Sequence, residues 1–226
     1  MSGRGNRPQG RRGRGERGPT ETLADYYRTV AADILELCGA DRSGLWVDLG
    51  SGEGGVGLAL ARKSQAHLVL VDPNGQALAR AVEAACGAGL HERVSAVCGR
   101  AEQIPLRSGS VRLVVSRGSI FFWDDPAEGL REVYRVLGKG GQAVIGGGLG
   151  RRYPLWARTE FVRRRHQAVQ AKGPAAVREF QRLRSPTTFR RWAEEAGLDE
   201  YLVTGEGGLP PEHPDTGLGL WLRFAK

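Results

Sequence analysis

The sequence predicts an α/β fold, in which a doubly wound, mostly parallel sheet of seven strands has helices on both faces and a C-terminal antiparallel hairpin. Three observations support this prediction. Apolar segments with strand and helix periodicity alternate along the chain. A glycine-rich turn at residues 50–55 connects the first strand to the following helix. The last two strands are close enough in sequence to pair antiparallel and form a hairpin at one edge.

Each element follows from its residue pattern and from the turn residues around it. The first helix ends before Gly39, and Asp125 and Ser185, each followed by proline, are N-caps of two later helices. Helices are expected over residues 20–38, 53–63, 75–87, 126–137 and 186–196. Strands are expected over residues 45–49, 67–71, 94–98, 111–116, 142–146, 201–204 and 219–224.

Composition divides the chain into an arm and one domain. Residues 1–18 carry six arginines against Glu16 and no aliphatic residue beyond Met1, which predicts a disordered arm rich in arginine and glycine. Residues 19–226 suffice for a single domain with one core. Within it, residues 149–184 are expected to form a basic helical insertion over the carboxyl ends of the strands, where the second substrate must enter.

Other features of the sequence limit the classes of protein that are compatible with it. No apolar run approaches the roughly 18 residues of a membrane span, and no secretory signal is recognisable, so we expect a cytoplasmic protein without a membrane span. Three cysteines, Cys38, Cys86 and Cys98, show no spacing typical of metal ligands. This favours reduced thiols and predicts no metal site. The sequence makes no prediction of oligomeric state.

The glycine-rich turn and the strand after it predict a site for a nucleoside cofactor. Glycines let the backbone approach a ligand closely, and the positive end of the next helix favours an anionic group. The apolar run 67–71 ends at Asp72, whose carboxylate can accept hydrogen bonds from two ribose hydroxyls. Both features lie at the carboxyl edge of the predicted sheet.

The turn by itself is compatible with two kinds of cofactor. Gly50, Gly52 and Gly55 spell G-x-G-x-x-G, and Asp72 lies at the customary distance for a dinucleotide site. Asp48, inside the strand end, favours a different ligand, because its carboxylate repels a pyrophosphate and attracts an ammonium or a sulfonium. S-adenosyl-L-methionine (SAM) carries both cations, together with a carboxylate and a ribose. We therefore expect SAM as the cofactor.

Four segments, in order along the chain, resemble the class I SAM-dependent methyltransferases, in the group related to ubiquinone and menaquinone biosynthesis methyltransferases (methyltransferase type 11 domain). They are Val47-Asp-Leu-Gly-Ser-Gly-Glu-Gly, Leu70-Val-Asp-Pro-Asn, Gly99-Arg-Ala-Glu-Gln-Ile-Pro-Leu and Leu130-Arg-Glu-Val-Tyr-Arg-Val-Leu-Gly-Lys-Gly-Gly. The resemblance covers residues 24–148 well and residues 186–226 loosely. It implies a Rossmann-like fold and an enzyme that transfers a methyl group from SAM and produces S-adenosylhomocysteine.

The resemblance also implies which residues bind the cofactor. Residues 50–52 would hold the methionyl part, Asp72 the ribose, and Pro73 would flank the adenine. Arg100 stands where the family commonly has an aspartate, so Glu102 or a backbone carbonyl must accept the adenine amino group. The full expected cofactor site is Asp48, Gly50, Ser51, Gly52, Asp72, Pro73, Ala101, Glu102 and Ser116.

Residues 116–125 stand where the family lines the methyl-transfer cleft, and two interpretations remain open there. In one, Arg117 grips an anionic substrate while the aromatic residues 121–123 shield the sulfonium or stack on a ring. In the other, Phe121 and Trp123 pack under the next helix and Arg117 pairs with Asp124 or Asp125. The candidates for a catalytic role are Arg117, His166 and Tyr27.

The expected function is methyl transfer to a small-molecule acceptor, for which an anionic or an aromatic molecule is a candidate. The alternative is an RNA-directed methyltransferase that holds nucleic acid with the basic arm and the insertion. The tetrapeptide Asn-Pro-Pro-Tyr, which positions an exocyclic base amine, is absent from the sequence. A nicotinamide oxidoreductase would need a hydride-transfer acid such as Tyr-x-x-x-Lys, which the sequence also lacks. A SAM-binding module without catalysis is a further possibility.

Overall fold

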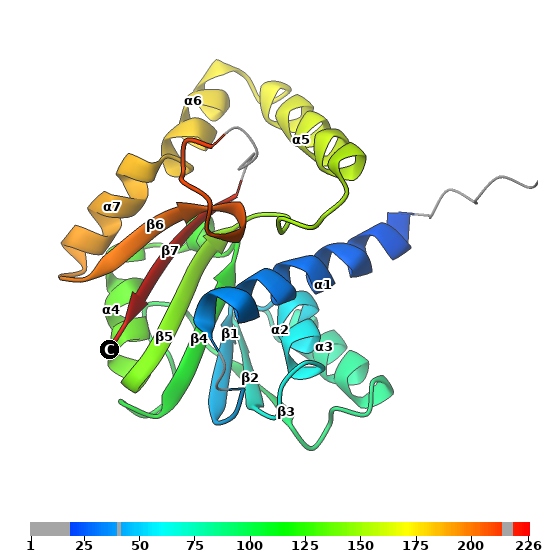
Figure 1. Cartoon of the computed structure of the whole chain (residues 1–226), viewed down its shortest axis with the longest axis vertical. Coiled ribbons are helices and arrows are strands. Elements are labelled where there is room, and N and C mark those ends of the chain that lie inside the picture. Colours follow the sequence, from blue (N-terminus) through cyan, green and yellow to red (C-terminus); the bar gives the residue numbers. More distant parts are fainter. Residues whose placement is uncertain (1–18, 40–41, 214–218) are drawn as a thin grey trace, which may run out of the picture.

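The computed structural model describes residues 19–39, 42–213 and 219–226, so the predicted arm 1–18 lies outside the described residues. Seven strands form one sheet in the order β3-β2-β1-β4-β5-β7-β6, which confirms the predicted mostly parallel sheet with a C-terminal antiparallel hairpin; β7 is also antiparallel to β5. The strands are β1 (Leu45–Leu49), β2 (His67–Asp72), β3 (Val94–Cys98), β4 (Val111–Arg117), β5 (Leu137–Gly147), β6 (Tyr201–Gly205) and β7 (Leu220–Ala225). The last strand of the chain therefore lies between β5 and β6 (Figure 1).

Helices cover both faces of this sheet (Figure 1). One face carries α1 (Pro19–Cys38), α2 (Gly55–Ala61) and α3 (Gly75–Gly87), and the other carries α4 (Pro126–Val136) and α7 (Pro186–Glu195). The predicted N-caps of α4 and α7 are confirmed, because Asp125 Oδ1 accepts from the Glu128 N–H and Ser185 Oγ from the Thr188 N–H.

Two apolar layers result from the alternation of side chains along the strands. In β1, Trp46 packs in the layer under α1, α2 and α3, whereas Val47 and Leu49 pack in the layer under α4 and α7. The central parallel strands are buried on both faces, which explains why they read as nearly continuous apolar runs. No helix of the described residues combines the length and the apolar character needed to cross a bilayer.

The insertion expected at 149–184 contains α5 (Leu155–Gln170) and α6 (Pro174–Leu183), which lie beyond the carboxyl ends of the parallel strands (Figure 1). Its connection to β5 is held by buried carboxylates. Glu206 accepts hydrogen bonds from the N–H groups of Leu149 (2.5 Å) and Gly150 (2.8 Å), and Asp33 accepts one from the N–H of Arg151. These bonds fix the start of the insertion, so that α5 lies beyond the carboxyl ends of the parallel strands.

Candidate active site

The turn after β1 has the backbone conformation that its glycines predict. Gly50 and Gly52 have φ values of 70° and 53°, in the left-handed region. A Cβ on Gly50 would lie 2.2 Å from that of Ser119, whereas one on Gly52 would meet nothing within 4 Å. The Gly50 and Ser51 N–H groups donate to the Val71 carbonyl, and Gly52 donates to Asp72. The N–H groups of residues 50–52 are therefore already paired within the protein.

Asp48 lies under the turn and is only 2% exposed. Its Oδ2 accepts a hydrogen bond of 2.8 Å from the Gly57 N–H. Burial raises the pKa of this carboxyl to about 7; the hydrogen bond from Gly57 opposes the shift, and the charge of Asp72 adds to it. A cation in the adjoining cavity would favour the ionised carboxylate, so Asp48 has the environment expected of a cation-binding group.

A cavity of about 190 Å³, which we call the loop cavity, separates this turn from α1. Asp48, Ser51, Gly52, Tyr27 and Arg117 line it. The Ser51 Oγ is buried and has no hydrogen-bond partner among the residues that the structure describes. Because buried hydroxyls are normally paired, this atom fits a ligand with a polar group in the cavity. The ammonium of SAM is such a group, and Asp48 would neutralise its charge.

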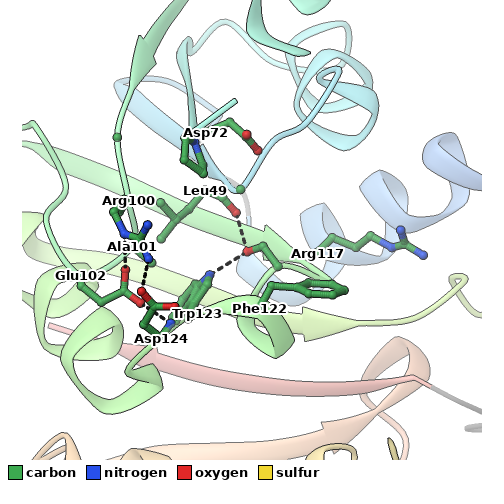
Figure 2. Close-up of a pocket in the computed structure, with 14 residues that line it drawn as sticks. Leu49, Asp72, Arg100, Ala101, Glu102, Arg117, Phe122, Trp123 and Asp124 are labelled. Carbon is green, nitrogen blue, oxygen red and sulfur yellow. Dashed lines mark hydrogen bonds and ion pairs between the residues drawn. The ribbon is translucent and has the colours of Figure 1, made fainter. Parts of the chain in front are cut away.

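A larger cavity, the main cavity, has a volume of about 480 Å³ and runs from Asp72 to Trp123 (Figure 2). Asp72 accepts from the Gly52 N–H through Oδ2 and from the Asn74 N–H through Oδ1, both at 2.8 Å. Each oxygen keeps a further lone pair for a ribose hydroxyl. The expected residues Gly50, Pro73, Ala101 and Glu102 line the same cavity.

At the far end of the main cavity, Glu102 was expected to accept a hydrogen bond from the adenine amino group. The Oε1 of Glu102 already accepts from two donors, the N–H groups of Asp124 (2.7 Å) and Asp125 (3.2 Å). Arg100 binds the Asp124 carboxylate (Figure 2). Asp124, 79% exposed, is thus a second carboxylate at this end, and it was not among the residues predicted for the cofactor site.

Ser116 lines neither the loop cavity nor the main cavity. It is buried, and its hydroxyl is hydrogen-bonded to that of Ser119, which lines the main cavity. Ser119 Oγ also donates to the Leu49 carbonyl and accepts from the Trp123 indole N–H, both at 3.0 Å (Figure 2). Ser116 therefore supports the wall of the main cavity from behind.

Arg117, the last residue of β4, lines the loop cavity, the main cavity and a third cavity on the side of the insertion. Its guanidinium lies 4.4 Å from the centre of the Tyr26 ring, and its Nε is 3.4 Å from the Gly148 carbonyl. The interpretation that pairs Arg117 with Asp124 or Asp125 is wrong, because Arg117 points toward α1 (Figure 2) while Asp124 binds Arg100 and Asp125 caps α4. Trp123 does pack under α4, where a Cβ on Gly129 would be 2.5 Å from its ring.

Burial lowers the pKa of Arg117 to about 10; Glu206 opposes this shift and Arg165 adds to it. The group therefore stays protonated at neutral pH. In the described part of the chain, no carboxylate forms an ion pair with it. A partly buried cation that forms no direct ion pair favours the binding of an anion.

The other two catalytic candidates lie apart from each other. Tyr27 lines the loop cavity, and its ring covers Gly55, where a Cβ would be 2.4 Å away. Burial, and then the charges of Glu53 and Asp48, raise the pKa of Tyr27, so its hydroxyl stays protonated at neutral pH and is disfavoured as a base. His166 is exposed on α5, lies edge-on to Phe180, and lines none of the three cavities.

The third cavity, the aromatic cavity, has a volume of about 330 Å³ and lies between the strand ends and the insertion. It shares Arg117, Gly118 and Phe122 with the main cavity, so the two adjoin. Its other large side chains are Tyr26, Tyr27, Phe121, Phe161, Arg165 and Arg184. Arg165 and Arg184 were predicted as part of the basic insertion but not as site residues. The signal available was that neither has an acidic residue three or four positions away.

Comparisons with known proteins agree with this geometry. The family described as "Methyltransferase domain" matches residues 47–145, from β1 to β5. The chloroplastic 2-methyl-6-phytyl-1,4-hydroquinone methyltransferase of Arabidopsis thaliana is 34% identical over 51% of this chain and 32% of its own length. The dimethylglycine N-methyltransferase of Parasynechococcus marenigrum is 26% identical over 90% of this chain and 78% of its own. The match thus spans about a third of the first relative.

Solved structures agree as well. A Methanococcus maripaludis structure assigned as a SAM-dependent methyltransferase superposes with a TM-score of 0.74 and 28% identity, over 92% of this chain and 88% of that one. A SAM-dependent methyltransferase from Aquifex aeolicus has the same fold, with a TM-score of 0.62 at 16% identity over 93% and 98% of the two chains. Residues 47–145 therefore match a methyltransferase domain, and the chain is similar to class I SAM-dependent methyltransferases, including enzymes of quinone biosynthesis, which supports SAM as its cofactor.

Proposed function

We propose that this chain transfers the methyl group of SAM to a small-molecule acceptor held in the aromatic cavity. The observation that carries the proposal is the shared lining of the main and aromatic cavities, which adjoin at Arg117, Gly118 and Phe122. At about 330 Å³ the aromatic cavity has the size of a small-molecule site. A cofactor in the main and loop cavities would then face an acceptor across this shared lining.

Different residues around the cavities would bind different parts of SAM. Asp72 would accept the ribose hydroxyls, Asp48 and the Ser51 hydroxyl would bind the ammonium, and Pro73 and Ala101 would contact the adenine. When bound, SAM supplies a methyl group, whose bond to the positively charged sulfur breaks as a lone pair of the acceptor attacks and the electron pair returns to sulfur. Phe122, 77% exposed at the junction, can cover the ligands and exclude water.

We further propose that the chain promotes methyl transfer by aligning the acceptor with SAM, and not by removing a proton from the acceptor. The described residues that line the aromatic cavity include no histidine and no carboxylate, and the pKa of Tyr27 is raised. Methyl transfer from a sulfonium needs the nucleophile, the methyl carbon and the sulfur in line, which a rigid pair of cavities can supply. His166, exposed on α5, has no part in this proposal.

The relatives support a small acceptor, since the names of two of them refer to a hydroquinone and to dimethylglycine. An RNA acceptor has less support. Several arginines of the insertion that such a ligand would need are paired with carboxylates, namely Arg151, Arg152, Arg163, Arg164 and Arg182. A cytoplasmic location remains part of the proposal, on the cysteine usage alone.

Incubation with methyl-labelled SAM tests the proposal. The protein would be given a small-molecule metabolite extract in one reaction and total RNA in another, with the Asp72→Ala variant in parallel. We expect labelled product in the metabolite reaction, reduced by Asp72→Ala, and none in RNA. Label in RNA alone would contradict a small acceptor. SAM binding without transfer to either would indicate a module without catalysis.

A further inference from the structure

The aromatic cavity carries a strong positive charge. Three arginines line it, Arg117 from β4, Arg165 from α5 and Arg184 from the end of α6, and no carboxylate is among its described lining residues. Arg165 lies close enough to both of the others to lower their pKa values, after the larger effect of burial. Three like charges around a half-buried cavity repel one another, so an anion bound between them would be stabilised.

Aromatic rings hold Arg184 in place without using its N–H groups. Its guanidinium lies 3.8 Å from the centre of the Phe121 ring and 4.1 Å from that of Phe180, and Arg165 lies 5.5 Å from the Phe180 ring. Stacking covers the faces of the guanidinium, while its donors project from the edges in the plane of the group. Such a group can still bind a carboxylate or phosphate through two parallel hydrogen bonds.

The neighbouring arginines are arranged differently. Arg164 binds Glu160 one turn back along α5, and Arg182 binds Glu179 on α6. Across the described residues, Arg165 and Arg184 form no ion pair of this kind and donate no side-chain hydrogen bond. The contrast lies between adjacent residues, because Arg164 faces solvent and Arg165 faces the cavity. Of these two neighbours, the one without an ion pair is thus the one that lines the cavity.

We propose that the acceptor is an aromatic molecule with a carboxylate or phosphate group, which Arg165 and Arg184 bind while its ring packs against Phe121 and Phe122. This inference rests on the proposed function, because it names the acceptor of the same site. The aromatic lining supplies flat apolar surface for the ring, and the two arginines supply the donors for the anion. Arg117, at the junction with the main cavity, then faces the end of the acceptor nearest the cofactor.

Calorimetric titration of the full chain with three probes tests the anion site. Benzoate and phenyl phosphate carry the two anions, and benzamide is the neutral probe of the same size. We expect at least one anion to bind about tenfold or more tightly than benzamide, which corresponds to about 1.4 kcal/mol, and the tighter of the two identifies the anionic group. Arg165→Gln and Arg184→Gln should each remove most of this difference and leave the Kd for SAM unchanged.

Arg164→Gln is the matched control, since it removes the same charge one residue away and outside the cavity. Arg184→Lys keeps the charge, and circular dichroism melting would show that each variant folds. The inference is overturned if benzamide binds as tightly as both anions, or if Arg164→Gln weakens anion binding as much as Arg165→Gln does.

A second measurement separates the inference from the proposed function. The metabolite extract would be divided on an anion-exchange resin before incubation with labelled SAM. Product from the retained fraction, with a raised KM in Arg165→Gln, supports an anionic acceptor. Product from the unretained fraction alone overturns the inference and leaves the methyltransferase function intact. Transfer to neither fraction overturns both.

Discussion

The two sides of the active site carry opposite charges. Asp48 and Asp72 lie where the cofactor is expected, beside the ends of β1 and β2, with Glu102 and Asp124 at the far end of the main cavity. The aromatic cavity next to it has three arginines and no carboxylate among its described lining residues. The main and loop cavities also contain Arg100 and Arg117, but their carboxylates outnumber these arginines. In the proposed arrangement, a cationic methyl donor would therefore meet net negative charge and its acceptor would meet positive charge. This difference suggests that charge assigns each ligand to its own cavity.

The two sides also differ in how their charges are held. Backbone N–H groups of Gly52, Gly57 and Asn74 donate to the carboxylates of Asp72 and Asp48, so the sheet and its turns position them. The arginines of the aromatic cavity stack on rings, Arg117 on Tyr26 and Arg184 on Phe121 and Phe180. Backbone hydrogen bonds preorganise the carboxylates, whereas Arg165 and Arg184 would gain their side-chain hydrogen bonds from a ligand.

The largest effect on stability is expected from Gly50→Ala, at a residue that lines both the loop cavity and the main cavity. The new Cβ would lie 2.2 Å from that of Ser119, at a φ of 70°. Left-handed strain and overpacking together should lower the free energy of unfolding by roughly 2–5 kcal/mol. Gly89→Ala is the control, because Gly89 has a φ of 69° and open space around its Cβ position. Denaturant titration giving equal losses for both variants would contradict the steric argument.

Asp72→Ala tests the cofactor side alone. Losing hydrogen bonds to a charged acceptor should weaken SAM binding by about 1.5–3 kcal/mol, measured by calorimetry. The variant also removes the acceptor of the Gly52 N–H, so the melting temperature should fall as well. Binding of benzoate and phenyl phosphate should stay unchanged, because Asp72 does not line the aromatic cavity. An unchanged SAM affinity would speak against the assigned ribose site.

Asp48→Asn should change stability and affinity in opposite directions. Because the pKa of Asp48 is raised to about 7 in the folded protein, the folded state binds a proton that the unfolded state has released between pH 4 and 7. Stability contributed by this group therefore falls as pH rises through that range and stays low above pH 7. The amide removes this cost, so the variant should be more stable by roughly 1–3 kcal/mol at pH 8 and equal to the parent near pH 4.

SAM affinity should fall in the same Asp48→Asn variant, because the amide does not neutralise an ammonium. In the parent protein, SAM should bind more tightly at pH 8 than at pH 6, since binding a cation favours the ionised carboxylate. The variant should lose this pH dependence. Calorimetry at the two pH values measures both effects, and a pH dependence retained in the variant would assign it to another group.

The smallest effect is expected from Arg117→Met, which tests the junction from the acceptor side. Arg117 is a partly buried cation that forms no direct ion pair in the described residues and has Glu206 as a more distant counter-charge, so an apolar side chain of similar length should change the free energy of unfolding by no more than about 1 kcal/mol. Methyl transfer should fall at the same time. Arg117→Lys, which keeps the charge, should retain part of the transfer activity. A large loss of stability in Arg117→Met would instead indicate a structural role.

Much of the fold was predictable because local patterns agree with tertiary packing. The strands 45–49 and 94–98 and the helix 75–87 have the predicted bounds, and two predicted N-caps accept the expected hydrogen bonds. The position of β7 between β5 and β6 was not predicted, because adjacency in sequence indicates pairing but not which strand of a hairpin lies at the edge. That order depends on which strand covers β5.

Charge was less predictable than secondary structure. The basic insertion was visible in composition, yet which arginines face the cavity depends on the rotation of α5 and α6 against the strand ends. Arg164 and Arg165 are adjacent in sequence and face different surroundings. The partner of Arg117 was likewise open between an anionic substrate and Asp124 or Asp125, because the choice depends on the direction in which its side chain leaves β4; in the structure it lies against Tyr26.

The amino-acid sequence alone predicted the class of fold, the resemblance to methyltransferases, the cofactor and the acidic groups at the ends of β1 and β2, because these follow from local motifs and from their order along the chain. Tertiary structure decided the site that we propose for the acceptor. It is assembled from α1, β4, β5, α5 and α6, and only their packing brings Arg117, Arg165 and Arg184 around one cavity. Charges that are far apart along the chain interact only after folding has brought them together.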